Sequence, residues 1–167
     1  MDDSRHVPLH ARPALPGDAA AIARIYNEGI EDRIATFETR PRTPEEITRW
    51  FDGVHPIVVA EEAGHVVGFA STSSYRPRDC YSKTAEFSVY VGRDHRGRQV
   101  GRQALGALIE ESRKAGLHKL VSRIFPENVA SRAACRAAGF REVGVYKEHG
   151  QLEGEWKDCV IVERLVD

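Results

Sequence analysis

Hydrophobic and polar residues follow two different periods along this chain, and each period predicts one kind of element. From Thr84 to Val91 the period is two residues, with one apolar face and an opposite face formed by Thr84, Glu86, Ser88 and Tyr90. This alternation predicts a strand with one buried face. From Ala19 to Ile30 the apolar residues recur every three or four positions, which predicts an amphipathic helix.

The other segments alternate between strand and helix signals. A capping box at Thr43-Pro44-Glu45-Glu46 predicts a short helix that carries Ile47, Trp50 and Phe51, and Ala63-Gly64 is typical of a hairpin turn. Strands are expected at 7–12, 56–61, 65–72, 118–125, 141–146 and 155–165, and further helices from Val100 to near Gly116 and from Asn128 to Gly139. This order predicts an α/β (α+β) fold in which helices cover both faces of a mixed sheet.

Length and charge narrow the class of protein. A chain of 167 residues fits one domain over 1–167, and 41% hydrophobic with 29% charged residues is typical of a soluble globular protein. The net charge is only -1, so we expect neither nucleic acid nor a membrane surface as a partner. The N-terminus lacks the apolar core of a signal peptide, and no apolar run approaches the roughly 20 residues that span a bilayer.

Cysteine and histidine usage argues against a disulfide framework and against a metal site. The three cysteines, Cys80, Cys135 and Cys159, form no CxxC pair and their number is odd. This usage favours a reduced cytoplasmic compartment. The seven histidines show no metal-ligand spacing, and we expect no metal.

The segment after the alternating strand carries the strongest chemical signal. The run Arg96-Gly97-Arg98-Gln99-Val100-Gly101 leads directly into a helix. A helix N-terminus presents free N–H groups and partial positive charge, which together bind phosphate. The run is neither a Walker A loop nor the GxGxxG dinucleotide motif, and on its own it could equally be a solvated, basic helix start.

A resemblance to a known family changes that balance. Phe87–Val91 followed by Asp94–Arg102 resembles the acetyl-CoA motif of the GNAT acetyltransferase superfamily, and Pro126–Ser131 with Ala138–Phe140 is similar to the family's next helix. The resemblance implies a mostly antiparallel sheet of about seven strands flanked by about four helices, with acetyl-CoA as co-substrate. The coenzyme-binding residues it implies are Val89, Tyr90, Val91, Arg96, Gly97, Arg98, Gln99, Val100, Gly101, Arg102, Asn128 and Ser131.

Within the superfamily the chain is similar to the phosphinothricin N-acetyltransferase group, which includes methionine sulfoximine and arsinothricin acetyltransferases. The similarity lies in Ile25–Asn27, Arg76–Tyr81, Glu86–Val91 and Gly154–Asp158. It implies a small amino-acid-like amine as substrate and a homodimer. Two positions depart from the superfamily pattern, because Gln99 replaces the motif's first glycine and Cys135 replaces the usual Tyr or His.

Acetyl transfer to an amine needs a base, a polarised carbonyl and a proton for the leaving thiolate. An alkyl amine with a pKa near 10 is mostly protonated at neutral pH. The resemblance makes Glu86 the candidate general base, with Ser88 beside it on the substrate side. A solvent-facing strand glutamate is the alternative. The resemblance also implies that the backbone N–H of Val91, freed by a bulge, polarises the thioester carbonyl.

Other roles stay open between a functional and an ordinary interpretation. Cys135 lies one helical turn after Ser131 and could protonate the thiolate, although a small buried helix residue is the simpler interpretation. Arg76 and Arg78, with Tyr81, could bind an anionic substrate group, or they could form a solvated charged loop.

Three functions are consistent with the sequence. The first is a small-molecule N-acetyltransferase in which the amine attacks acetyl-CoA directly. The second is a transferase for protein N-termini or lysines. The third is a non-catalytic acyl-CoA sensor, which the departures at Gln99 and Cys135 favour.

Overall fold

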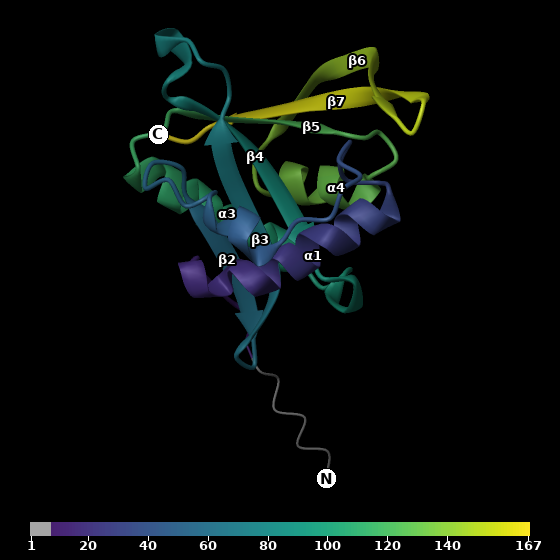
Figure 1. The fold of residues 1–167 in the computed structure, drawn as a ribbon. Helices are drawn as coiled ribbons and strands as arrows, with labels where there is room; N and C mark the ends of the chain where they lie inside the picture. Colours follow the sequence, from purple (N-terminus) through teal and green to yellow (C-terminus); the bar gives the residue numbers. More distant parts are fainter. Residues whose placement is uncertain (1–7) are drawn as a thin grey trace.

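Seven strands form one sheet in the order β1-β2-β3-β4-β5-β7-β6 in the computed structural model, which describes residues 8–167 (Figure 1). All neighbouring pairs are antiparallel except β4 and β5, which are parallel. The mixed, mostly antiparallel sheet is therefore confirmed. The strands are β1 His10–Pro13, β2 Ile57–Glu62, β3 His65–Ser74, β4 Thr84–Val91, β5 Lys119–Ile124, β6 Arg141–Leu152 and β7 Glu155–Leu165; the helices are α1 Ala19–Asp32, α2 Pro44–Thr48, α3 Val100–Lys114 and α4 Val129–Ala137.

The sheet separates two hydrophobic cores, as the expectation of helices on both faces requires. Helices α3 and α4 bury one face, where Phe87 and Leu120 of the sheet meet Leu105 and Leu108 of α3. Helices α1 and α2 bury the lower part of the other face, and α1 crosses in front of β3 and β4 in Figure 1. The apolar stripes of the two longer helices account for this arrangement, because each faces the sheet.

Helix ends follow the capping residues that the sequence predicted. The side-chain oxygen of Thr43 accepts a hydrogen bond from the N–H of Glu46 at 3.2 Å, but the Glu46 carboxylate binds Arg40, so only half of the capping box forms. Helix α2 ends at Thr48, before Trp50 and Phe51. Gly139 has a φ of +87° just after α4, in the conformation that a terminating glycine supplies.

Two strand predictions differ from the structure by three residues or more at one end. The first strand begins at His10, and Val7, with which the predicted strand began, lies outside the described residues. The strand predicted to end at Tyr146 continues to Leu152. The strand continues through polar residues, with a register shift between Tyr146 and Gly150, before a two-residue turn. Hydrophobic periodicity does not reveal such an irregularity.

The face of α1 that touches the sheet depends on a glycine. Tyr90 of β4 stacks on Phe69 at 5.3 Å between ring centroids and meets the edge of Tyr26 at 5.1 Å. A Cβ atom added to Gly29 of α1 would lie 2.7 Å from the Tyr90 ring. Because the ring is held on its other sides by aromatic neighbours, it has little freedom to move aside.

We expect Gly29→Ala to lower the free energy of unfolding by about 1–3 kcal/mol through overpacking. The matched control is Gly106→Ala in α3, where nothing lies within 4 Å of the added Cβ. The control should raise stability by about 0.5–1 kcal/mol, the helix propensity difference. Urea denaturation of both variants measures the two effects, and a stabilising Gly29→Ala would contradict the packing described here.

Candidate acetyl-coenzyme site

Strands β4 and β5 pair for only three residues and then separate. The pairs are Thr84 with Lys119, Ala85 with Leu120 and Glu86 with Val121. Just beyond them, the hydroxyl of Ser122 donates to the carbonyl of Phe87 at 2.8 Å, the last bond across the junction. From there to its end β4 has β3 on one side and no strand of residues 8–167 on the other.

The open edge of β4 presents two backbone N–H groups. The N–H of Gly92 donates to the carbonyl of Val67 in β3, at 2.8 Å. Because backbone groups alternate sides along a strand, the N–H groups of Val89 and Val91 point the opposite way, toward the gap. The β3–β4 register has no shift along β4. The expected bulge is therefore absent from this ladder, and the separation of β5 frees these donors instead.

The N-terminus of α3 adds further donors at the same gap. The first hydrogen bond of the helix runs from Gln103 N–H to the carbonyl of Gln99, and no side chain of Gln99 caps the helix. The N–H groups of Val100, Gly101 and Arg102 are therefore without partners inside the helix. Gly97 and Gln99 have φ values of +79° and +63°, which turn the chain from β4 into α3.

Helix α4 forms the opposite wall with small side chains. The Asn128 side-chain oxygen accepts from Ser131 N–H at 3.2 Å, which confirms Asn128 as the N-cap. Its amide nitrogen remains available to the gap. The wall contains Ala130, Ala133, Ala134 and Ala137.

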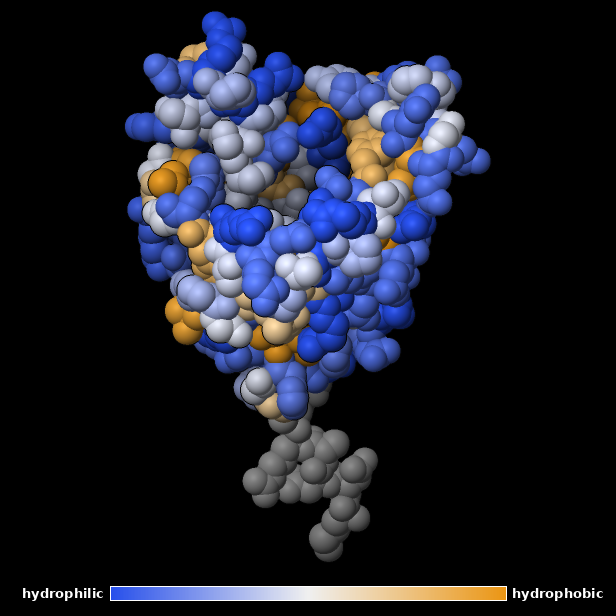
Figure 2. Space-filling model, in the orientation of Figure 1, coloured by the Kyte–Doolittle hydropathy of each residue, from blue (hydrophilic) through white to orange (hydrophobic). Residues whose placement is uncertain are grey.

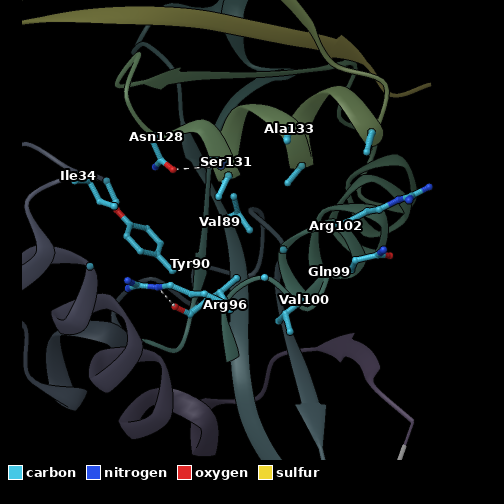
Figure 3. Close-up of a pocket in the computed structure, with 18 residues that line it drawn as sticks. Ile34, Val89, Tyr90, Arg96, Gln99, Val100, Arg102, Asn128, Ser131 and Ala133 are labelled. Atoms are coloured by element: carbon cyan, nitrogen blue, oxygen red, sulfur yellow. Dashed lines mark hydrogen bonds between the residues drawn. The ribbon is translucent and has the colours of Figure 1, made fainter. Parts of the chain in front are cut away.

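These elements enclose a cavity of about 450 Å³, with Tyr90 and Arg96 below α4 and Gln99 and Arg102 at the α3 end (Figure 3). Every coenzyme-binding candidate except Arg98 lines it. One end of the cavity, formed by Gly29, Ile34 and Ala35, was not predicted, because no motif marks the end of α1 and the residues after it. The alanines of α4 that line the cavity were not predicted either, because small residues on a helix face are equally typical of an ordinary buried stripe.

The arginines of the turn differ in their partners. Arg98 donates to both carboxylate oxygens of Glu62 at 2.7 Å, away from the cavity. Arg96 contacts the cavity and the Asp32 carboxylate at 2.6 Å. Burial alone would raise the pKa of Asp32, but hydrogen bonds from Arg96 and Arg93 outweigh it and lower that pKa. The Asp32 charge thus fixes the turn to the end of α1.

A second hollow lies on the α1 side of the sheet, over β4 and β5 (Figure 2). Glu86 and Val121 are register partners, so Glu86, Val121 and Arg123 share this face. Arg123 Nη2 lies 3.0 Å from Glu86 Oε1, and the two side chains are 47% and 31% exposed. Glu86 and Ser88 are outside the cavity lining, and Glu86 precedes Val89 by three residues, about 10 Å along the strand.

The predicted anion-binding loop lies elsewhere. Residues 75–83 project beyond the joined ends of β3 and β4 (Figure 1). The Arg76 guanidinium lies 5.0 Å from the Tyr75 ring centroid, and Tyr75 meets Tyr81 edge-on. Arg76, Arg78 and Tyr81 do not line the cavity. Arg123, which the sequence analysis did not single out, is the arginine that the structure brings to Glu86.

Comparison with known proteins identifies the family. Residues 22–140 match the model of the Acetyltransferase (GNAT) family. This chain belongs to the GNAT acetyltransferase family. It is 37% identical over 161 residues to an L-methionine sulfoximine/L-methionine sulfone acetyltransferase of Pseudomonas paraeruginosa, covering 93% of this chain and 94% of the relative.

Solved GNAT structures show the same fold. A phosphinothricin acetyltransferase from Sinorhizobium meliloti in complex with acetyl-CoA has a TM-score of 0.86 and 30% identity, covering 95% of this chain and 88% of that chain. A ribosomal-protein-alanine N-acetyltransferase from Brucella melitensis has a TM-score of 0.87 and 35% identity, covering 93% and 99%. The resemblance to GNAT enzymes and to the phosphinothricin group is confirmed.

Cys135, one of the two departures from the GNAT pattern, is a core residue. It is 1% exposed, belongs to the α3–α4 core and does not line the cavity. Burial, with the nearby charge of Glu142, raises the pKa of its thiol to about 12. This placement agrees with the simpler interpretation, a small buried helix residue.

The described residues, 8–167, contain all three cysteines of the chain. All three cysteines are free, so no disulfide joins them. In this part of the chain no helix is both long and apolar enough to cross a membrane. The described side chains contain no group of three or more His, Cys, Asp or Glu arranged to hold a metal.

Gln99, the other departure, occupies the left-handed conformation that glycine adopts at no steric cost. We expect Gln99→Gly to raise the free energy of unfolding by up to about 1 kcal/mol, because a side chain there is strained. Gly97→Ala should lower it by about 1 kcal/mol for the converse reason. Urea denaturation distinguishes the signs, and two changes of the same sign would contradict the described turn.

Proposed function

We propose that this GNAT protein transfers the acetyl group of acetyl-CoA to the amine of a small amino-acid-like substrate, by direct attack of the amine. One observation carries the proposal: the free N–H groups of β4 and of the α3 N-terminus converge on one cavity. A strand edge suits an extended amide chain, and a helix N-terminus suits a pyrophosphate.

The polar groups of the lining would match successive parts of acetyl-CoA. The open edge of β4 would pair with the amides of the pantetheine arm, the α3 amides and Arg102 with the phosphates, and the alanines of α4 would allow close approach. Bound there, acetyl-CoA supplies a thioester as acetyl donor. The N–H of Val91 would donate to the oxygen on which negative charge develops during attack.

Glu86 is the proposed general base. Its distance along the strand from the cavity favours proton removal through an intervening water rather than by direct contact. The buried Cys135 supports neither a covalent acyl-enzyme nor a thiol acid, so we assign the proton for the leaving thiolate to water. A location in the cytoplasm is consistent with three free cysteines.

The substrate class rests on relatives and on the hollow beside Glu86. The Pseudomonas relative is named for methionine sulfoximine and methionine sulfone, and the Sinorhizobium neighbour is named for phosphinothricin, all of which are free amino acid analogues. The Brucella neighbour is named for the alanine of a ribosomal protein. Acetylation of a peptide N-terminus is therefore the second candidate function.

We expect Glu86→Gln to lower kcat for methionine sulfone by about 10²–10⁴-fold, the range for loss of a general base. Affinity for acetyl-CoA should be unchanged, because Glu86 lies outside the cavity. Release of free coenzyme thiol measures turnover, and calorimetry measures binding.

The matched control is Glu110→Gln, an exposed glutamate of α3 that pairs with Arg113, which should keep full turnover. Wild-type kcat in Glu86→Gln would reject Glu86 as the base. Tight acetyl-CoA binding by a wild-type protein that acetylates neither amino acid analogues nor peptides would favour the sensor function.

We further propose that the protein is a homodimer that pairs through β6. This strand is an edge of the sheet and is exposed along almost its whole length. Its apolar residues Val143, Val145 and Tyr146 are 46–52% exposed, and Trp156 of β7 is 57% exposed. Exposed apolar side chains on an edge strand are typical of an interface.

We expect Val145→Asp to convert the dimer to a monomer, since it places a charge within this surface. Light scattering at micromolar concentration measures the mass. The control is Val54→Asp, an exposed valine between α2 and β2 (60%, against 49% for Val145), which should leave the dimer intact. A monomeric wild-type protein would overturn the proposal.

A further inference from the structure

Glu86 and Arg123 form an isolated ion pair where β4 and β5 separate. The contact joins Arg123 Nη2 to Glu86 Oε1 at 3.0 Å, and within residues 8–167 it is the only hydrogen bond of either side chain. Both side chains point to the sheet face that α1 leaves uncovered, over which the surface is hollowed (Figure 2). The pair is thus open to a ligand that approaches from this face.

The pair has spare bonding capacity on both sides. A guanidinium has five N–H donors and a carboxylate has two oxygens, and this contact uses one donor and one oxygen. Exposed ion pairs contribute little to stability, so a ligand can replace the contact at little cost. Arg98, by contrast, already engages both oxygens of Glu62.

The arrangement of charges matches one kind of ligand. An α-amino acid carries an ammonium and a carboxylate on the same carbon atom. Glu86 attracts the ammonium and Arg123 attracts the carboxylate, in bidentate geometry if both oxygens bind. Two residues after Arg123 along the chain, Phe125 meets Phe37 edge-on at 4.8 Å between ring centroids.

We propose that Arg123 binds the carboxylate of a free α-amino acid whose ammonium Glu86 attracts through the intervening water, with Arg123 as the residue that selects substrates carrying the carboxylate. The proposal rests on the function proposed above and narrows its substrate. It distinguishes free amino acids from peptide N-termini and simple amines, because neither of these has a carboxylate beside the reacting amine.

The test compares two substrates that differ only in the carboxylate: L-methionine sulfone and its decarboxylated amine, 3-(methylsulfonyl)propylamine. For Arg123→Gln we expect kcat/KM for methionine sulfone to fall about 10–100-fold, mainly through KM, the loss typical of a charge-assisted hydrogen bond. For the decarboxylated amine the change should be less than about threefold, since no contact is lost. Arg123→Lys should recover part of the loss because the charge is kept.

Two controls keep the result interpretable. Arg113→Gln removes another exposed arginine, which is paired with Glu110 on α3. This variant should keep the wild-type kcat/KM for both substrates. Calorimetry with methionine sulfone in the presence of coenzyme A measures affinity without turnover. In Arg123→Gln the dissociation constant for methionine sulfone should rise by the same factor as KM.

Equal losses for both substrates in Arg123→Gln would overturn the inference, because they would show that Arg123 only positions Glu86. Unchanged KM and affinity for methionine sulfone would also overturn it. Both results leave the proposed function intact. A wild-type protein that binds acetyl-CoA but neither binds nor acetylates methionine sulfone would instead refute the proposed substrate class.

Discussion

The separation of β4 from β5 is the constraint on which the rest of the site depends. A parallel pair that continued to the end of β4 would satisfy the Val89 and Val91 N–H groups and close the gap. Instead, pairing ends at Glu86 and Val121, and the hydroxyl of Ser122 donates a hydrogen bond to the next carbonyl of β4, that of Phe87. Backbone groups that would be costly to leave unpaired in a core become donors to a ligand.

The same junction joins the two halves of the site. Beyond the junction, toward the C-terminal end of β4, the open edge of this strand faces α4 and the N-terminus of α3. A cavity of about 450 Å³ lies between these elements. At the junction, Glu86 and Arg123 face the opposite side of the sheet. Under the function proposed above, an acetyl donor in the cavity and an amine at the hollow beside Glu86 would meet through the gap, without any side chain having to cross the sheet.

Much of the fold and most of the cavity lining were predictable, because their signals are local. Alternation along 84–91 gives β4 its faces, Asn128 caps α4, and Gly97 permits the turn into α3. The substrate side was not predictable to the same degree. Arg123 and Glu86 are 37 residues apart, and their contact depends on a strand register that periodicity cannot give. The sequence did hold one sign, a lone arginine in the otherwise mostly apolar strand 118–125.

Charge pairing explains why arginines of similar sequence context differ in function. Arg98 and Arg93 are paired with Glu62 and with Asp32 and Glu31, so they fasten the turn to the rest of the protein. Arg102 has no ion pair within residues 8–167 and lies at the cavity's end, where its charge is available to an anion. A motif gives the number of arginines near a phosphate, but the acidic residues on neighbouring elements determine which of them can bind it. In this chain Asp32, at the end of α1, also ties this helix to the turn that borders the cavity.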